Sequence, residues 1–209
     1  MFSWRIALAV FITAVLTEAH VVRAQVASIE SAAEAVTMTD AQRIAWIDRC
    51  KDQDRRFDSA LMDAFEHAPN DQVRIDLAYV IGQRRVFSRP DLLIPYLSLY
   101  DIRWETNHFQ NRWTSYPVAE ALGKIGEPAV FPIMRLLVTT VDDKTTELGV
   151  GALRLGVGRE GARGILRSAL QIDTDKVRQQ RLQKALKELI RQVGDEPKPG
   201  SEIPYAPSR

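Results

Sequence analysis

The chain has 209 residues, of which 45% are hydrophobic, 26% charged and 8% aromatic. This composition excludes collagen-like and low-complexity proteins, and a chain of this length can bury a core without disulfides. Because 28 basic residues nearly balance 27 acidic ones, the sequence also excludes a polycation built for nucleic acid.

Residues 1–24 have the pattern of a secretory signal peptide. Arg5 provides the positive charge, residues 6–16 form an uncharged apolar run, and small residues precede a cleavage position before Gln25. The apolar run is shorter than the roughly 20 residues that a membrane span needs. We therefore expect export to the periplasm or the extracellular space. The alternatives are an uncleaved anchor and an amphipathic N-terminal helix.

The remaining chain divides into three parts. Residues 25–38 are Ala-rich and are expected to be a linker or a frayed helix. Residues 39–193 form the folded body, which opens with the capping pair Thr39 and Gln42. Residues 194–209 contain four prolines and few apolar residues, which is typical of a disordered tail.

Apolar residues recur at helical spacing through the whole body, and no run alternates over strand length. The sequence therefore predicts an all-α fold. The stripes are Phe57, Leu61 and Phe65, then Val73, Leu77, Val80 and Ile81, and finally Leu182, Ala185, Leu186, Leu189 and Ile190. Cys50, the only cysteine, lies near Trp46 in this pattern and is expected to be a core residue.

The stripes and turn signals predict four helix pairs and one final helix. The pairs are 39–50 with 55–67, 71–83 with 89–100, 116–126 with 128–140, and 144–156 with 159–171; the final charged helix is 174–193. Such terminal helices with a polar outer face keep stacked repeats soluble.

Parts of these pairs repeat. Residues 77–82 match residues 121–126 at a separation of 44, and both copies end in Ile-Gly. This glycine is expected to take a left-handed conformation that closes the first helix. Residues 93–97 match residues 130–134 at a separation of 37, with a proline in the middle of each. A looser copy begins at Gly158.

Residues 119–130, Ala-Glu-Ala-Leu-Gly-Lys-Ile-Gly-Glu-Pro-Ala-Val, resemble a HEAT repeat of the short, phycobilisome-lyase-like kind. The resemblance extends over roughly residues 70–190 and departs from the pattern at Leu148, where the Val-Arg pair of Val73 and Arg74 has no counterpart. It implies a right-handed α-solenoid of stacked antiparallel helix pairs that binds other molecules along its faces. A lyase-like enzyme follows by family analogy only.

Residues 101–115 interrupt the repeat and are long for a connection between stacked pairs. The segment is rich in Trp and Arg, which dominate binding hot spots. It therefore predicts a partner-binding insertion, and the alternative is that it extends the next helix and fills the core. The candidate contact residues are Arg103, Trp104, His108, Phe109, Arg112 and Trp113.

The charge is uneven along the body. Residues 25–152 hold 14 basic and 19 acidic residues, whereas residues 153–191 hold 10 basic and 4 acidic ones. The basic end could bind an acidic glycan, a lipid headgroup or, less readily, nucleic acid, and the alternative is a solvated end cap. The candidate anion-binding residues are Arg159, Arg163, Arg167, Arg178 and Arg181.

Two further patterns are interpreted as structural. Glu105 and His108 have the spacing of a metal-binding pair, but no second such pair exists in the mature chain. Residues 156–161 spell G-x-G-x-x-G, but a helix rather than a strand is predicted before them. We expect no metal, no cofactor and no catalytic set. The sequence thus favours an exported, monomeric, non-catalytic scaffold that binds another protein.

Overall fold

A computed structural model describes residues 55–102 and 115–193, together with residues 42, 45, 46, 49 and 50. All regular elements in this part of the chain are helices, as the periodicity predicted, and no strand occurs there. The elements are α3 (Arg56–Glu66), α4 (Asp71–Arg84), η2 (Pro90–Tyr96), α6 (Pro117–Ile125), η3 (Glu127–Ala129), α7 (Val130–Thr139), α8 (Asp143–Ile172) and α9 (Lys176–Val193).

These elements follow the predicted succession of helices to within a few residues. The long helix α8 contains one break at Gly158, where φ is 75° and ψ is 170°. The break separates a first half, residues 143–157, from a second half, residues 159–172. It coincides with the predicted turn of the fourth pair, and it shows that the G-x-G-x-x-G sequence connects two helices instead of following a strand.

Polar side chains cap the starts of α4 and α8 and so fix where these two helices begin. The Asn70 side chain accepts a hydrogen bond of 3.0 Å from the backbone N–H of Val73 at the start of α4. The Asp142 carboxylate accepts one of 2.6 Å from the N–H of Thr145 at the start of α8. Each cap satisfies an amide that has no partner inside the helix.

The second helix of the second pair is shorter and tighter than predicted. The sequence predicted a helix over residues 89–100, whereas η2 is a 3-10 helix that ends at Tyr96. Pro95 lies inside it, and a proline has no N–H to donate to the carbonyl four residues earlier. The α-helical bonding pattern is therefore interrupted, and the segment adopts the tighter winding.

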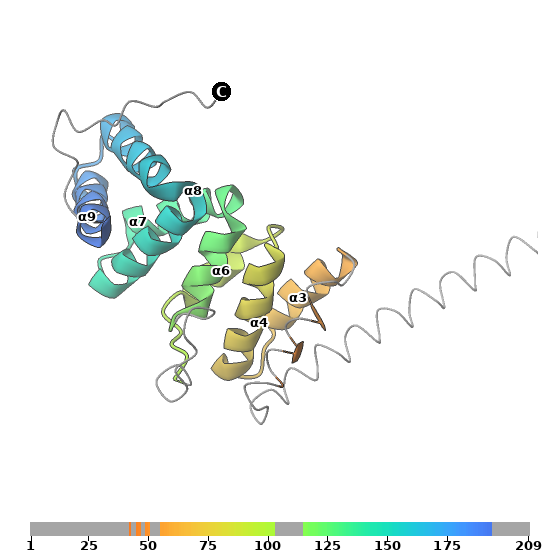
Figure 1. The fold of residues 1–209 in the computed structure, drawn as a ribbon. Helices are drawn as coiled ribbons and strands as arrows, with labels where there is room; N and C mark the ends of the chain where they lie inside the picture. The colour runs from red at the N-terminus through yellow and green to blue at the C-terminus, as the bar shows by residue number, and fades with distance from the viewer. Residues whose placement is uncertain (1–41, 43–44, 47–48, 51–54, 103–114, 194–209) are drawn as a thin grey trace, which may run out of the picture.

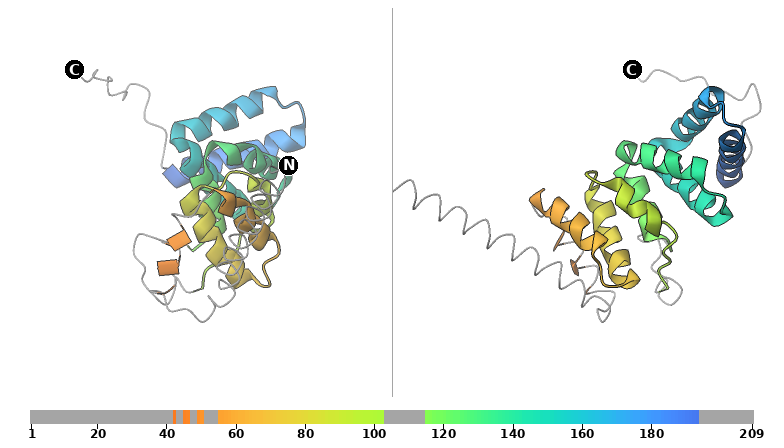
Figure 2. Two further views of the ribbon diagram at one scale, coloured as in Figure 1. Left: turned by 90° about the vertical axis from the view of Figure 1, so that its right-hand side faces the viewer. Right: turned by 180° about the vertical axis from the view of Figure 1, so that it is seen from behind.

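The helices succeed one another across the molecule from α3 at one end to α9 at the other (Figure 1). In this succession α3 packs against α4, α4 against α6, α6 against α8, and α8 against α9. The elements η2 and α7 also pack against each other, and α7 continues onto α8 and α9. The right-hand view of Figure 2 shows the same order from behind. Each helix thus packs mainly against its neighbours in this succession of helices from α3 to α9, which we call the row.

Close contact between helices depends on glycine. A Cβ on Gly82 would lie 2.9 Å from the Cα of Ala121, so α4 and α6 can approach this closely only without that side chain. Gly82 was predicted to close its helix, and this prediction is wrong. The helix continues to Arg84, and Arg85 takes the left-handed conformation, with φ 52° and ψ 51°. Gly126 does follow the end of α6 with a positive φ of 81°, but its ψ of -135° lies outside the left-handed helical region that was predicted.

The predicted apolar stripes, with the exception of Ile190, belong to one core cluster. Phe57, Leu61 and Phe65 are fully buried, and Trp46 and Cys50 belong to the same cluster. Burial raises the pKa of the Cys50 thiol to about 11, although the charges of Arg84 and Arg49 act in the opposite direction. Cys50 is therefore a protonated core thiol at neutral pH, as the sequence suggested.

Several predicted segments lie outside the described residues. These are the signal peptide at residues 1–24, the linker at 25–38 and the proline-containing tail at 194–209. Within the described part of the chain, no helix combines the length and the apolar character that crossing a membrane would need.

Candidate functional site

The predicted partner-binding residues Arg103, Trp104, His108, Phe109, Arg112 and Trp113 lie outside the described residues. The described ends of their segment are joined, because the N–H of Asp101 donates a hydrogen bond of 2.9 Å to the carbonyl of Ser115. The hydroxyl of Tyr79, on α4, donates to the buried carboxylate of Asp101 at 2.9 Å. The two described ends of the segment therefore meet at one point beside α4.

The predicted anion-binding arginines make contacts within the chain. Arg163 is only 9% exposed, and its guanidinium lies 3.3 Å from the carboxylate of Glu160. The guanidinium of Arg159 lies 3.7 Å from that same carboxylate.

The arginines of α9 also face other parts of the chain. Arg178 pairs with Asp173 at 3.0 Å. Arg181 donates to the backbone carbonyl of Val138 at 2.8 Å and so attaches α9 to the end of α7. Arg167 is exposed on the second half of α8. The five residues are thus spread over the kink, the second half of α8 and the start of α9.

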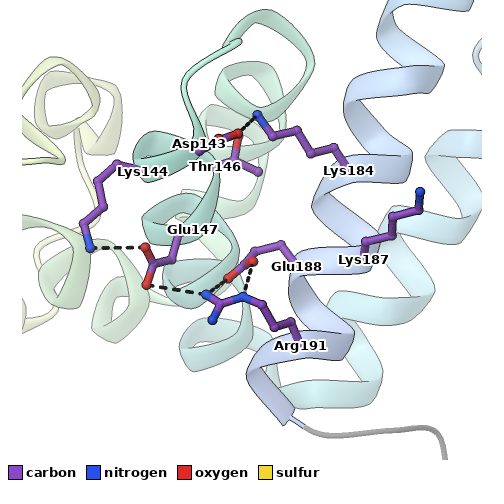
Figure 3. Close-up of a pocket in the computed structure, with 8 residues that line it drawn as sticks. All are labelled: Asp143, Lys144, Thr146, Glu147, Lys184, Lys187, Glu188 and Arg191. Atoms are coloured by element: carbon purple, nitrogen blue, oxygen red, sulfur yellow. Dashed lines mark hydrogen bonds and ion pairs between the residues drawn. The ribbon is translucent and has the colours of Figure 1, made fainter.

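A charged pocket of about 550 Å³ lies where the start of α8 meets α9 (Figure 3). Sequence reasoning missed it, because its residues come from two segments about 40 positions apart. The lining residues are Asp143, Lys144, Thr146, Glu147, Lys184, Lys187, Glu188 and Arg191.

Ion pairs neutralise most of this pocket. Arg191 forms a two-pronged contact with Glu188, with both N–O distances 2.7 Å, and lies 3.7 Å from Glu147. Lys144 forms an ion pair of 3.2 Å with Glu147, and Lys184 forms one with Asp143. The hydrogen bond from Arg191 is the largest of the effects that lower the pKa of Glu188.

Lys187 is the exception in the charged pocket. Figure 3 draws its side chain pointing away from the pairs, and within the described residues it has no ion pair. The pocket is therefore chiefly a set of contacts between α8 and α9. The ammonium group of Lys187 lies at its edge without an ion pair among the described residues.

A second, more apolar groove of about 340 Å³ lies between η2 and α7. Its lining residues are Asp91, Ile94, Pro95, Phe131, Pro132, Arg135, Leu136 and Thr139. Phe131 is 76% exposed, which is unusual for a phenylalanine. We call this surface the η2–α7 groove.

The η2–α7 groove is built by the repeat. Ile94 and Pro95 occupy the same repeat positions as Phe131 and Pro132, and the packing of η2 on α7 brings the two pairs to one groove. Sequence reasoning aligned these residues but took them for structural positions. An aromatic residue at an outward repeat position was the signal that could have identified the groove.

The described residues include no group of three or more His, Cys, Asp and Glu side chains placed to hold a metal ion. Comparisons of the chain with protein-family models, with curated proteins and with solved structures find no match.

Proposed function

We propose that this protein is an exported, non-catalytic scaffold of the HEAT-like α-solenoid type that binds another protein. The observation that carries the proposal is the η2–α7 groove, where an exposed aromatic ring stands on an apolar floor. Exposed apolar patches with a polar rim mark interaction sites on soluble proteins. The order of helix contacts along the row supports the solenoid, and residues 1–24 support export.

The test is to isolate the tagged full-length protein from the extracytoplasmic fraction of its native host and to identify what co-purifies in stoichiometric amount. We expect one protein partner and a mass that corresponds to residues 25–209. Recovery only from the cytosol, with residues 1–24 intact, would contradict export. A protein that is recovered from the correct fraction without any partner would contradict the scaffold.

The Trp-containing segment, residues 101–115, is included in this proposal only because it is rich in Trp and Arg. If it contributes to binding, the double variant Trp104→Ala and Trp113→Ala should lose the partner while the far-UV circular dichroism of the protein stays unchanged. Full retention of the partner by this folded variant would remove the segment from the contact surface.

A second candidate is binding of an anionic polymer or surface through the basic C-terminal end. The observation that favours it is the open position of Lys187 at the edge of the charged pocket and the exposure of Arg167. Binding of this kind falls steeply as salt increases, because counterions are released. Retention on immobilised heparin that is independent of salt, or no retention at all, would exclude it.

A further inference from the structure

The η2–α7 groove is a local feature of the row. In the looser third copy of the repeat, the position equivalent to Phe131 is Arg163. Arg163 is buried and pairs with Glu160, so the apolar wall does not continue onto the second half of α8. The groove therefore ends on the side of α8, which suits a short segment rather than a long fibre.

Two opposite charges flank the apolar floor. Asp91 lies in the first turn of η2, and Arg135 lies one turn after Phe131 on α7. Both side chains are exposed, and neither forms an ion pair or a hydrogen bond within the described part of the chain. By contrast, Arg89 on the neighbouring loop is paired with Asp63 and Glu66.

The small volume of the groove favours a polypeptide over a small ligand as its occupant. Its volume of about 340 Å³ is near the lower limit of the roughly 300–1,000 Å³ that small-molecule sites span. Phe131 remains mostly exposed on its rim, so a small ligand in the groove would leave much of the ring in water. A protein segment that crosses the groove can cover the ring and bury its apolar surface.

We propose that the η2–α7 groove binds a short apolar segment of a partner protein in which a basic residue and an acidic residue flank the apolar core. The basic residue pairs with Asp91, the acidic residue pairs with Arg135, and the apolar side chains pack on Phe131, Ile94 and the two proline rings. This inference rests on the proposed function and names the chemistry of the partner. The paired charges fix the direction in which the segment lies, because reversing it would bring like charges together.

The test uses a phage-displayed library of random dodecapeptides, selected on the full-length protein. We expect the enriched peptides to share an apolar core with a basic residue on one side and an acidic residue on the other. Selection on the variant Asp91→Lys should enrich peptides with an acidic residue on both sides of the apolar core, and selection on Arg135→Glu should enrich peptides with a basic residue on both sides. Such a change in the flanking charges does not follow from a loss of folding, because an unfolded variant would select no defined flanking charges.

Affinity measurements on one enriched peptide complete the test. Phe131→Asp should weaken binding about 30-fold, the loss typical of a hot-spot residue. Ile172→Asp is the matched control, since Ile172 is 79% exposed but does not line the groove. This variant should bind as the wild type does.

Two results would overturn the inference. One is the same pair of flanking charges on the wild type and on both single variants, and the other is equal weakening by Phe131→Asp and Ile172→Asp. If instead a partner co-purifies from the native host and is retained by Phe131→Asp, the scaffold stands and only the groove assignment fails. If no partner co-purifies, the proposed function itself fails.

Discussion

At Gly82 the lack of a side chain allows two helices to touch. A Cβ there would lie 2.9 Å from the backbone of Ala121, whereas a Cβ on Gly164 would have no neighbour within 4 Å. Both glycines lie in helices, where alanine is intrinsically preferred by about 1 kcal/mol. The environment of each glycine, and not its helix propensity, therefore decides the sign of a substitution.

We predict that Gly82→Ala lowers the free energy of unfolding by about 1–3 kcal/mol, because the new methyl group forces α4 and α6 apart. Gly164→Ala is the matched control and should raise that free energy by up to about 1 kcal/mol. Urea denaturation of both variants measures the difference. A Gly82→Ala variant as stable as the wild type would show that the two helices do not meet as described.

The burial of single residues could largely be predicted from the helical spacing of apolar residues. Their backbone conformation could not. Phe57, Leu61 and Phe65 were assigned to the core from their helical period alone, because the period directly records which face is covered. The left-handed conformation was assigned to Gly82 but belongs to Arg85. Packing against Ala121 requires glycine at position 82, and this requirement cannot be told from a capping requirement in the sequence.

At the scale of single elements, helix starts depend on a few polar side chains. The Asn70 side chain caps α4, which lies between α3 and α6 in the row. A helix that begins in the wrong place would misalign the contacts on both of its sides.

Replacing Asn70 by alanine should therefore destabilise the protein by about 1 kcal/mol, since the amide of Val73 loses its partner. Asn70→Asp keeps an acceptor at the same place and should retain most of the stability. Thermal and urea unfolding of the two variants make the comparison. Equal losses in both would mean that the hydrogen bond of the cap is not what position 70 contributes.

Helix α9 contains an ion pair, Glu188 with Arg191, whose contribution to stability depends on pH. The hydrogen bond from Arg191 lowers the pKa of Glu188 below its ordinary value of 4.5. Because the folded-state pKa is the lower one, the carboxylate stabilises the fold above pH about 4.5. This contribution is lost as the pH falls through the folded-state value.

We expect Glu188→Gln to be less stable than the wild type at pH 7, and the difference in unfolding free energy to shrink as the pH falls below about 4.5. Denaturation curves between pH 3 and pH 7 test this. Glu127→Gln is the control, because Glu127 is exposed and forms no ion pair within the described residues. A difference for Glu188→Gln that stays constant with pH would contradict the expectation.

Element boundaries were predictable where a local signal sets them. Helix α8 begins at Asp143, one residue before the predicted start, and the break at Gly158 coincides with a predicted turn. The 3-10 winding of η2 was missed, because the effect of Pro95 on the bonding pattern depends on how the segment packs. The charged pocket was missed as well, since Glu147 and Arg191 meet only after α9 has packed on α8.

At the scale of the whole molecule, successive packing places equivalent residues of neighbouring units side by side. The η2–α7 groove arises in this way from Ile94 and Phe131, which lie 37 positions apart. The sequence contained the repeat but not the exposure of its residues. Whether a repeat position faces its neighbour or the solvent depends on the rotation of each helix, and that rotation is a property of the assembled row.

The most direct test of the account is photocrosslinking in the native host. Phe131 is replaced by p-benzoylphenylalanine in the full-length protein, and a second variant carries the same residue in place of Ile172. The account predicts a covalent adduct with one protein from position 131 and none from position 172. An absence of adducts at position 131, or the same adducts from both positions, would contradict the claim that the groove binds a protein partner.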